Sequence, residues 1–84
     1  MAYLHLGQNT VTPTSEIVGI FDLDKATVGR HTKSFLEQAQ KKKQVIDVCD
    51  DLPKSFVVCQ REKNTRVYIT QVSAATLRKR NENP

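Results

Sequence analysis

Residues 54–72 read Lys54-Ser-Phe-Val-Val-Cys-Gln60, Arg61-Glu-Lys-Asn-Thr65 and Arg66-Val-Tyr-Ile-Thr-Gln-Val72. The first and third segments are rich in β-branched and aromatic residues, which favour strands, and the middle segment is polar. The pattern therefore predicts two strands joined by a hairpin loop at residues 61–65. Ser73 can then cap a short helix at Ala74–Arg80, and a polar tail follows from about residue 81.

Upstream of this stretch the sequence predicts four more strands. Tyr3–Leu6 and Thr10–Thr12 flank a Gly-Gln-Asn turn and are expected to pair as a first hairpin. Glu16–Leu23 has apolar residues on both faces, which is typical of a central strand covered on both sides, and Gly19 suggests a bulge or a close backbone approach. Val45–Val48 alternates as a short strand.

Between these strands, residues Val28 to Lys43 have the periodicity of an amphipathic helix. Its apolar positions follow spacings of three and four: Val28, Thr32, Phe35, Leu36 and Ala39. Asp24 or Thr27 can cap its first turn. Its last turn is Lys41-Lys42-Lys43, where cations suit the negative end of the helix dipole.

These elements follow the order β-β-β-α-β-β-β-α in a single domain over residues 1–84. Hairpins outnumber possible crossovers, so the predicted class is α+β, with a small, mostly antiparallel sheet, one main amphipathic helix and a short C-terminal helix. The core is modest, and the apolar residues of Tyr3–Leu6 and Ala74–Leu77 have little to cover them in a monomer. We therefore expect a homo-oligomer larger than a dimer that repeats one heterologous contact around a ring.

The composition also bears on location and on the cysteines. No apolar run approaches the roughly 20 residues of a membrane span, and the N-terminus lacks the basic start and long apolar stretch of a signal peptide. We therefore expect a cytoplasmic protein that does not contact the membrane. Cys49 and Cys59 are not spaced as a redox or zinc motif and are expected to remain free thiols.

The sequence offers little support for catalysis. His5 and His31 belong to different predicted elements, and no Cys-His or Ser-His-Asp arrangement follows from the spacing. Asp47, Asp50 and Asp51 cluster around a turn, which is typical of a solvated loop. The three glycines are scattered and form no phosphate-binding loop. We expect no enzymatic activity, no metal site and no cofactor.

Charge is segregated along the chain. Residues 1–24 contain three acidic residues and no Lys or Arg, while the remainder contains all 13 basic residues and six acidic ones. A basic surface attracts phosphate-rich partners because each docked Lys or Arg releases condensed counterions. Duplex DNA is therefore a candidate partner.

The basic residues fall into three groups, on the amphipathic helix, on the second hairpin and in the tail. No group matches a reading helix, a zinc finger or an RNA motif, so phosphate contacts have to carry any binding of nucleic acid. Phe21, Phe35 and Phe56 are expected in the core, which argues against stacking on single-stranded bases. The candidate DNA-binding residues are Arg30, Lys33, Lys41, Lys42, Lys43 and Lys54.

Five blocks follow one another along nearly the whole chain: Tyr3-Leu-His-Leu-Gly7, Glu16-Ile-Val-Gly-Ile-Phe21, Ile46-Asp47, Lys54-Ser-Phe-Val-Val58 and Val67-Tyr-Ile-Thr-Gln-Val-Ser-Ala-Ala-Thr-Leu77. In order and spacing they resemble the bacterial extracellular matrix regulatory (Rem) family, nearest to its B branch. The family's A branch consists of small DNA-binding regulators that assemble into rings and activate biofilm matrix genes. The resemblance therefore implies a cytoplasmic, ring-forming regulator of matrix gene expression.

The chain departs from the A branch at three arginine positions. Those relatives carry an arginine just ahead of the strand matching Ile17–Phe21, where this chain has Glu16. They carry an arginine pair ahead of the strand matching Ser55–Gln60, where this chain has Asp51 and Leu52, and Lys54 alone keeps a positive charge nearby. A carboxylate repels the phosphate that an arginine binds.

Two interpretations therefore stay open. The first is a DNA-associated regulator that contacts duplex DNA mainly through the phosphates. The second is a ring-forming interaction module of the same fold that binds a protein partner and no DNA.

Overall fold

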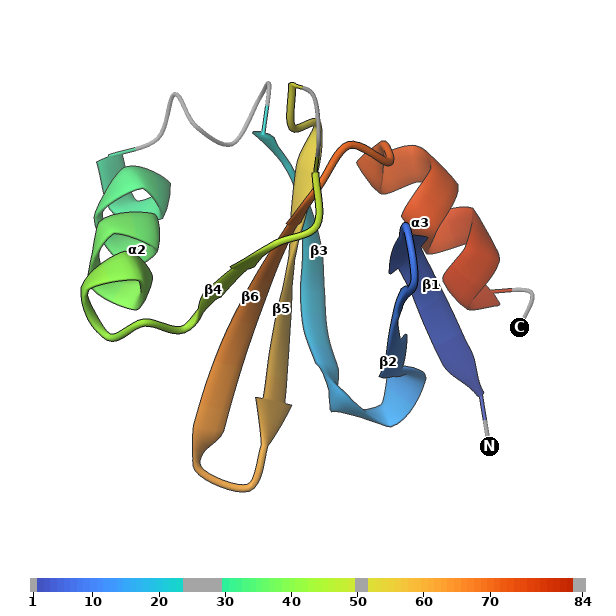
Figure 1. Ribbon diagram of the computed structural model, residues 1–84, viewed down its shortest axis with the longest axis horizontal. Coiled ribbons are helices and arrows are strands. Elements are labelled where there is room, and N and C mark those ends of the chain that lie inside the picture. The colour runs from blue at the N-terminus through green and yellow to red at the C-terminus, as the bar shows by residue number, and fades with distance from the viewer. Residues whose placement is uncertain (1, 24–29, 50–51, 83–84) are drawn as a thin grey trace.

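The computed structural model describes residues 2–23, 30–49 and 52–82. Its elements in chain order are β1 (Tyr3–Gly7), β2 (Thr10–Pro13), the 3₁₀ helix η1 (Thr14–Glu16), β3 (Ile17–Asp22), α2 (Arg30–Lys41), β4 (Val45–Asp47), β5 (Ser55–Arg61), β6 (Asn64–Thr70) and α3 (Ala74–Glu82) (Figure 1). The predicted order β-β-β-α-β-β-β-α and the α+β class are confirmed.

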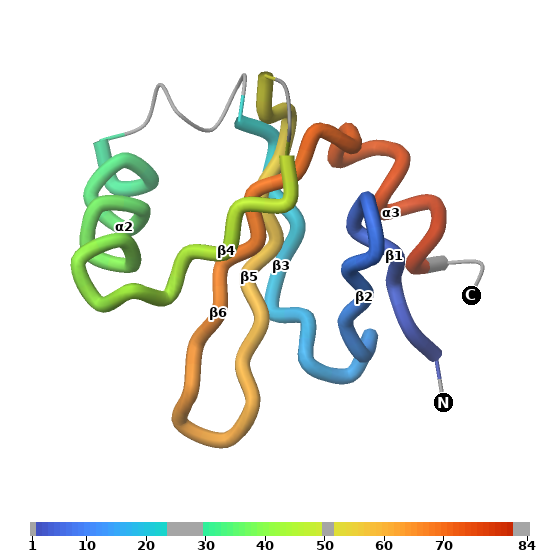
Figure 2. Tube along the Cα trace, in the orientation of Figure 1, coloured from blue at the N-terminus to red at the C-terminus, as the bar shows by residue number. Residues whose placement is uncertain are grey.

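The strands form two sheets where one was expected. β1 pairs with β2 in a first hairpin, as predicted, and the other strands form a four-stranded sheet in the order β3-β5-β6-β4. In this sheet the β4–β6 pair is parallel and the other two pairs are antiparallel. Figures 1 and 2 show the four-stranded sheet between α2 on one side and α3 with the β1–β2 hairpin on the other.

β5 supplies both cores, because successive side chains of a strand point to opposite faces of its sheet. Val57 and Cys59 belong to the core beneath β1 and α3, whereas Phe56 and Val58 belong to the core beneath α2. All four side chains are buried. The apolar run of β5 therefore marks a central strand that is covered on both faces.

The apolar residues near the two ends of the chain are covered within the protein itself. Leu4 and Leu6 of β1 share one core with Ala74 and Leu77 of α3, and none of the four is more than 2% exposed. The expectation that these residues lack cover in a monomer is therefore wrong, because the hairpin and the C-terminal helix close over the same face of the sheet. Tyr3 remains 53% exposed.

β3 lies at an edge of the four-stranded sheet, paired with β5. The prediction of a central strand covered on both sides is therefore wrong, and Val18 and Phe21 are 63% and 41% exposed. The predicted irregularity at Gly19 is confirmed, since the register with β5 shifts between Ile17 and Gly19. A Cβ atom on Gly19 would lie 2.6 Å from the Phe21 ring, so the ring packs against the glycine backbone.

The β5–β6 hairpin is confirmed, with a tighter connection than predicted. Antiparallel pairing continues to Arg61 opposite Asn64, which leaves Glu62 and Lys63 as a two-residue turn. Glu62 has a φ of 57°, the left-handed conformation that such turns require. The predicted five-residue loop is wrong because its outer residues continue the two strands.

The main helix ends at Lys41, two residues before its predicted end. The amide of Lys43 donates to the carbonyl of Gln40 at 3.0 Å, and the amide of Gln44 donates to the carbonyl of Ala39 at 2.9 Å. These are the two bonds of a Schellman motif, and Lys43, with a φ of 58°, takes the position that glycine normally holds. Four residues at the predicted start of the helix lie outside the described residues: Asp24, Thr27, Val28 and Gly29.

The C-terminal helix α3 begins as predicted. The backbone amide of Thr76 donates to Oγ of Ser73 at 3.2 Å, which is the bond expected of an N-cap. The helix continues past its predicted end at Arg80 to Glu82. The residues expected to start a polar tail are therefore helical.

Candidate nucleic-acid interface

Three of the six candidate DNA-binding residues share the outer face of α2. Arg30, Lys33 and Lys41 are exposed, and their spacing in a helix of 3.6 residues per turn places them on one side. Glu37 lies on the same side and reduces the net charge of this stripe. Ala39, on the opposite side, is buried against the sheet. The stripe therefore faces solvent.

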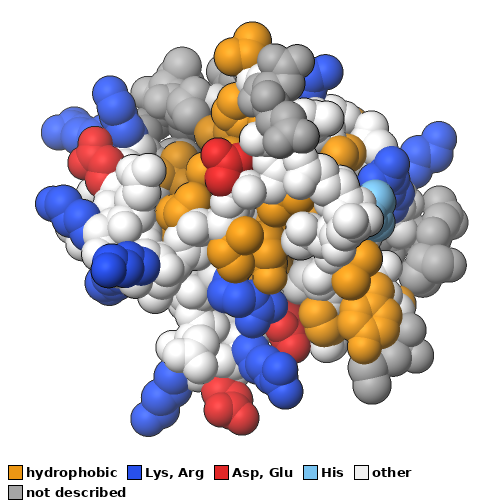
Figure 3. Space-filling model, in the orientation of Figure 1, with side chains coloured by type: hydrophobic (Ala, Val, Ile, Leu, Met, Phe, Trp, Pro, Cys, Tyr) orange, Lys and Arg blue, Asp and Glu red, His pale blue; other side chains and the backbone are white. Residues whose placement is uncertain are grey.

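The other three candidates lie outside the helix. Lys42 and Lys43 form the turn that follows it, and both are exposed. Lys54 precedes β5, where its carbonyl accepts a bond from the amide of Leu23 at the end of β3. The 12 residues of α2 span about 18 Å, so its cations and the turn after it form an elongated basic stripe, whereas Lys54 belongs to a separate part of the fold. Figure 3 shows Lys and Arg side chains gathered over α2.

The six candidate side chains are also alike in their bonding within the described residues. In the part of the chain that the structure describes, none of them forms a hydrogen bond or an ion pair with another residue. Exposed cations without internal partners are the ones that remain available to phosphate groups. The structure thus leaves this set free for an anionic partner.

The four remaining arginines are engaged within the protein. Arg78 donates through Nη2 to the carbonyl of Ile20 at 2.7 Å, and Arg80 donates through Nη1 to the carbonyl of His5 at 3.2 Å. Both bonds fasten α3 to strands near the start of the chain. The basic residues that the sequence groups with the tail are therefore largely structural.

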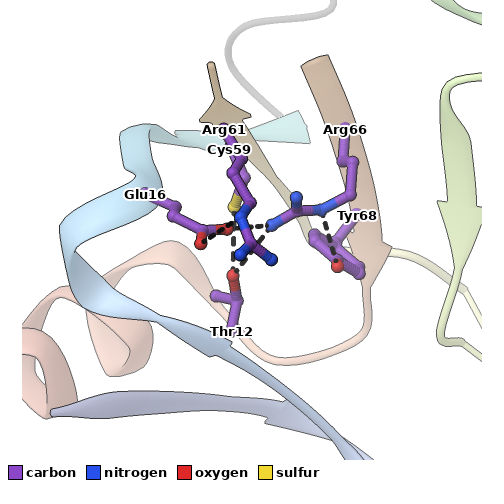
Figure 4. Close-up of polar contacts among 6 residues, drawn as sticks. All are labelled: Thr12, Glu16, Cys59, Arg61, Arg66 and Tyr68. Carbon is purple, nitrogen blue, oxygen red and sulfur yellow. Dashed lines mark hydrogen bonds and ion pairs between the residues drawn. The ribbon is translucent and has the colours of Figure 1, made fainter. Parts of the chain in front are cut away.

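Arg66 and Arg61 both face Glu16 (Figure 4). Nη2 of Arg66 lies 2.6 Å from Oε1 of Glu16, and Nε of Arg61 lies 3.9 Å from Oε2. Arg66 also donates to the hydroxyl groups of Tyr68, at 3.1 Å, and Thr12, at 3.4 Å. The side chains of Arg66 and Glu16 are 26% and 17% exposed, so this pair is shielded from solvent, whereas Arg61 is 74% exposed and its longer contact is weak.

This network neutralises the carboxylate of Glu16. Glu16 joins η1 to the β5–β6 hairpin through Arg66, 50 residues away in the sequence. The hydrogen bond that Arg66 donates to Glu16 is the main cause that raises the pKa of Arg66 above its usual range, so the guanidinium stays charged. The location is a closed internal ion pair and not an open anion site.

Cys59 extends the same network into the core. Its Sγ lies 3.6 Å from Oγ1 of Thr12, and burial is the main cause that raises the pKa of its thiol. A protonated, buried thiol is a poor nucleophile. Cys59 therefore acts as a packing residue, and Cys49 lies half-buried after β4.

A groove opens between α2 and the sheet, which we call the phenylalanine groove. It has a volume of about 320 Å³, and among the described residues its lining is Val18, Phe21, His31, Thr32, Phe35, Phe56 and Val58, none of which is Asp, Glu, Lys or Arg. The rings of Phe21 and Phe56 stack with centroids 5.0 Å apart. Phe35 is 40% exposed, so the prediction that Phe21 and Phe35 belong to the core is wrong, although Phe56 is buried as predicted.

Comparison with known proteins assigns the sequence to one family. Residues 3–80 match the family described as RemA-like, extracellular matrix regulatory protein A-like. The chain belongs to this family. Among its curated relatives, extracellular matrix regulatory protein B of Bacillus subtilis (strain 168) is 37% identical over 78 residues, which are 93% of this chain and 88% of the relative. The resemblance to the B branch of the Rem family is thereby confirmed.

Within residues 2–23, 30–49 and 52–82, no group of three or more His, Cys, Asp or Glu side chains is placed to hold a metal ion. No helix of these parts is long and apolar enough to cross a membrane.

Sequence reasoning missed two features of this RemA-like protein. The pairing of Glu16 with Arg66 is invisible locally, because the two residues meet only through the fold. The phenylalanine groove was missed because an apolar residue at an edge has the same pattern as one in a core. The sequence signal that could have indicated the groove was the presence of apolar residues on both faces of β3.

Proposed function

We propose that this protein is a cytoplasmic, self-associating regulator of extracellular matrix and biofilm gene expression that binds duplex DNA mainly through phosphate contacts. The observation that carries the proposal is the set of six exposed cations without internal acceptors in the described residues. Membership in the RemA-like family, with a relative named as an extracellular matrix regulatory protein, supports the regulatory role.

Binding by one copy alone is expected to be weak and tolerant of sequence. Three of the cations share an exposed helix face with Glu37, the other three lie outside the helix, and no group matches a motif that reads base edges. Several copies that contact one duplex act together, because each later contact is made at high effective concentration. Self-association is therefore part of the proposal.

The test is the salt dependence of binding to a fluorescent duplex, measured by anisotropy. The logarithm of the binding constant should fall steeply with the logarithm of salt concentration, by a slope of about 0.9 for each phosphate neutralised. Replacing Lys41, Lys42 and Lys43 together by Glu should abolish binding, and Lys54→Glu should weaken it in the same direction.

Lys63→Glu is the matched control, because Lys63 is exposed in the β5–β6 turn and lies outside the candidate set. It changes the net charge by the same amount as Lys54→Glu and should retain most of the affinity. Equal loss in both variants would mean that only net charge matters, and no binding at low salt would refute the DNA-binding proposal.

The second candidate function is a ring-forming interaction module that binds a protein partner and no DNA. The specific observation in its favour is Glu16, which closes with Arg66 the location where DNA-binding relatives carry an arginine. This alternative becomes the better one if the wild-type protein assembles but shifts no duplex at low salt.

A further inference from the structure

β3 forms an edge of the four-stranded sheet, and its sequence favours pairing with a further strand. Residues 17–21 read Ile-Val-Gly-Ile-Phe, with no charged residue and no proline, between Glu16 and Asp22. In the described residues no strand pairs with β3 on the side away from β5. Short uncharged segments of high β-propensity at an open edge add strands from other molecules, so proteins that keep such edges protect them.

The backbone of β3 turns the carbonyl group of Ile20 toward this open edge. In an antiparallel pair, residues bonded to the partner strand alternate with residues whose amide and carbonyl groups point away from it. The amide of Leu23 donates to the carbonyl of Lys54 at 3.0 Å, so Leu23 faces β5. The register is regular from Ile20 to Asp22, so Ile20, three residues before Leu23, points away from β5.

Arg78 of α3 occupies this carbonyl group. Its Nη2 donates to the carbonyl oxygen of Ile20 at 2.7 Å, a short distance that is typical of a charged donor. The neighbouring Leu77 is fully buried in the same core as Ile20, which holds α3 beside the strand. A strand that paired along this edge would displace the guanidinium and leave its charge against apolar side chains, which is costly.

We propose that Arg78 caps the open edge of β3 and prevents the β3 strands of two copies from pairing with each other. The excluded partner is a second copy, because residues 17–21 form an uncharged segment that can pair with itself in an antiparallel ladder. The inference goes beyond the proposed function and does not depend on it, since it concerns a contact that the native protein avoids.

The experiment compares the growth of intermolecular β-sheet in the full chain and its variants, without DNA. Thioflavin T fluorescence follows the growth, and the infrared amide I band of intermolecular sheet identifies the product. Arg78→Gln removes the charged donor to Ile20, so more copies have an open edge and growth should be about ten-fold faster. Arg61→Gln is the matched control, because Arg61 is 74% exposed, and it should grow no faster than the wild type.

A second substitution separates edge pairing from a loss of stability. Val18 is 63% exposed on β3, and a lysine on an edge strand opposes pairing. Adding Val18→Lys to Arg78→Gln should return growth to the wild-type rate, although it restores no bond to α3. The same charge added by Asn64→Lys, at an exposed residue of β6, should not.

The outcomes distinguish the capping role from an effect on folding. If Arg78→Gln unfolds, as judged by circular dichroism, Arg78→Met replaces it, because methionine keeps the helix propensity of the position. Equal growth of the Arg78 and Arg61 variants would overturn the inference, and so would growth that Val18→Lys does not suppress. Failure to bind DNA, or a monomeric wild type, would refute parts of the proposed function and leave this inference intact.

Discussion

At the scale of single residues, Glu16 links two arginines of the β5–β6 hairpin to the start of the chain. Its carboxylate accepts a 2.6 Å bond from Arg66, and the pair ties η1 to the hairpin of β5 and β6. Removing one partner of a shielded pair leaves the other charge without compensation. The sequence comparison suggests Glu16→Arg as a gain of DNA contact. In the structure this change places a third guanidinium beside Arg61 and Arg66.

Glu16→Gln is therefore the clearer experiment on this residue. The amide keeps the shape but loses the charge, and the free energy of unfolding should fall by about 2 kcal/mol. Denaturant unfolding followed by circular dichroism measures this change. The affinity for duplex DNA should rise, because Arg66 and Arg61 no longer face the negative charge of Glu16.

Glu62→Gln is the matched control, since Glu62 is exposed in the hairpin turn. It removes the same charge and should leave stability within about 0.5 kcal/mol of the wild type. Equal stability of the two variants would contradict the structural role given to the Glu16–Arg66 pair.

At the scale of elements, the turn that ends α2 places a candidate DNA-binding residue, Lys43, in an unfavourable backbone conformation. Lys43 adopts a φ of 58° in the Schellman turn, a conformation that costs an L-residue with a side chain about 1 kcal/mol. Glycine takes this position in most such turns.

Lys43→Gly should therefore stabilise the protein by about 1 kcal/mol, which corresponds to about 4–8 °C in Tm for a domain of this size. Thermal unfolding by calorimetry measures the shift. Lys42→Gly removes the same charge in the same turn without relieving a positive φ, so it should lower Tm. If the two glycine variants have the same Tm, the strain assigned to Lys43 is absent.

Much of the element order was accessible from the sequence, because strand and helix periodicities are local. The hairpin of β5 and β6, the capping of α3 by Ser73 and the bulge at Gly19 all follow from residue types at short spacing. The edge position of β3 was not accessible, because Val18 and Phe21 look the same in a covered strand and in an open one. The division into two sheets depends on long-range pairing, which local patterns do not encode.

The candidate site was accessible to a smaller extent. The α2 cations could be listed from the sequence, and their role in DNA binding stays a prediction. The sequence could not show which arginines are already bonded within the protein and so unavailable to DNA. The acceptors of Arg66 and Arg78 lie 50 and 58 residues away along the chain. Charge counting treats all basic residues alike, whereas the fold separates those with internal partners from the others.

At the scale of the whole molecule, assembly and DNA binding are expected to be coupled. One copy offers a short basic stripe, and the proposed self-association would present several such stripes to one duplex. Linked sites gain affinity without any new contact, by factors of about 10²–10⁴.

Val11→Asp tests this coupling, because Val11 is an exposed apolar residue of the hairpin, on the other side of the sheet from α2. If the variant is monomeric, its affinity for a long duplex should fall about 10²-fold, with a shallower salt slope. Asn64→Asp, at an exposed residue beside the β5–β6 turn, carries the same charge change outside the candidate set and should bind as the wild type does. Unchanged binding by a monomeric Val11→Asp variant would mean that each copy acts alone on DNA.

The packing of β1 against α3 has a consequence for synthesis of the chain. Leu4 and Leu6 emerge from the ribosome early, but their core partners Ala74 and Leu77 emerge more than 60 residues later. Until then the first hairpin exposes both its faces, and contacts of such sequence separation are slow to form. The nascent chain therefore passes through a period in which leucines later hidden in the core are open to chaperones, and the fold closes only when its last helix arrives.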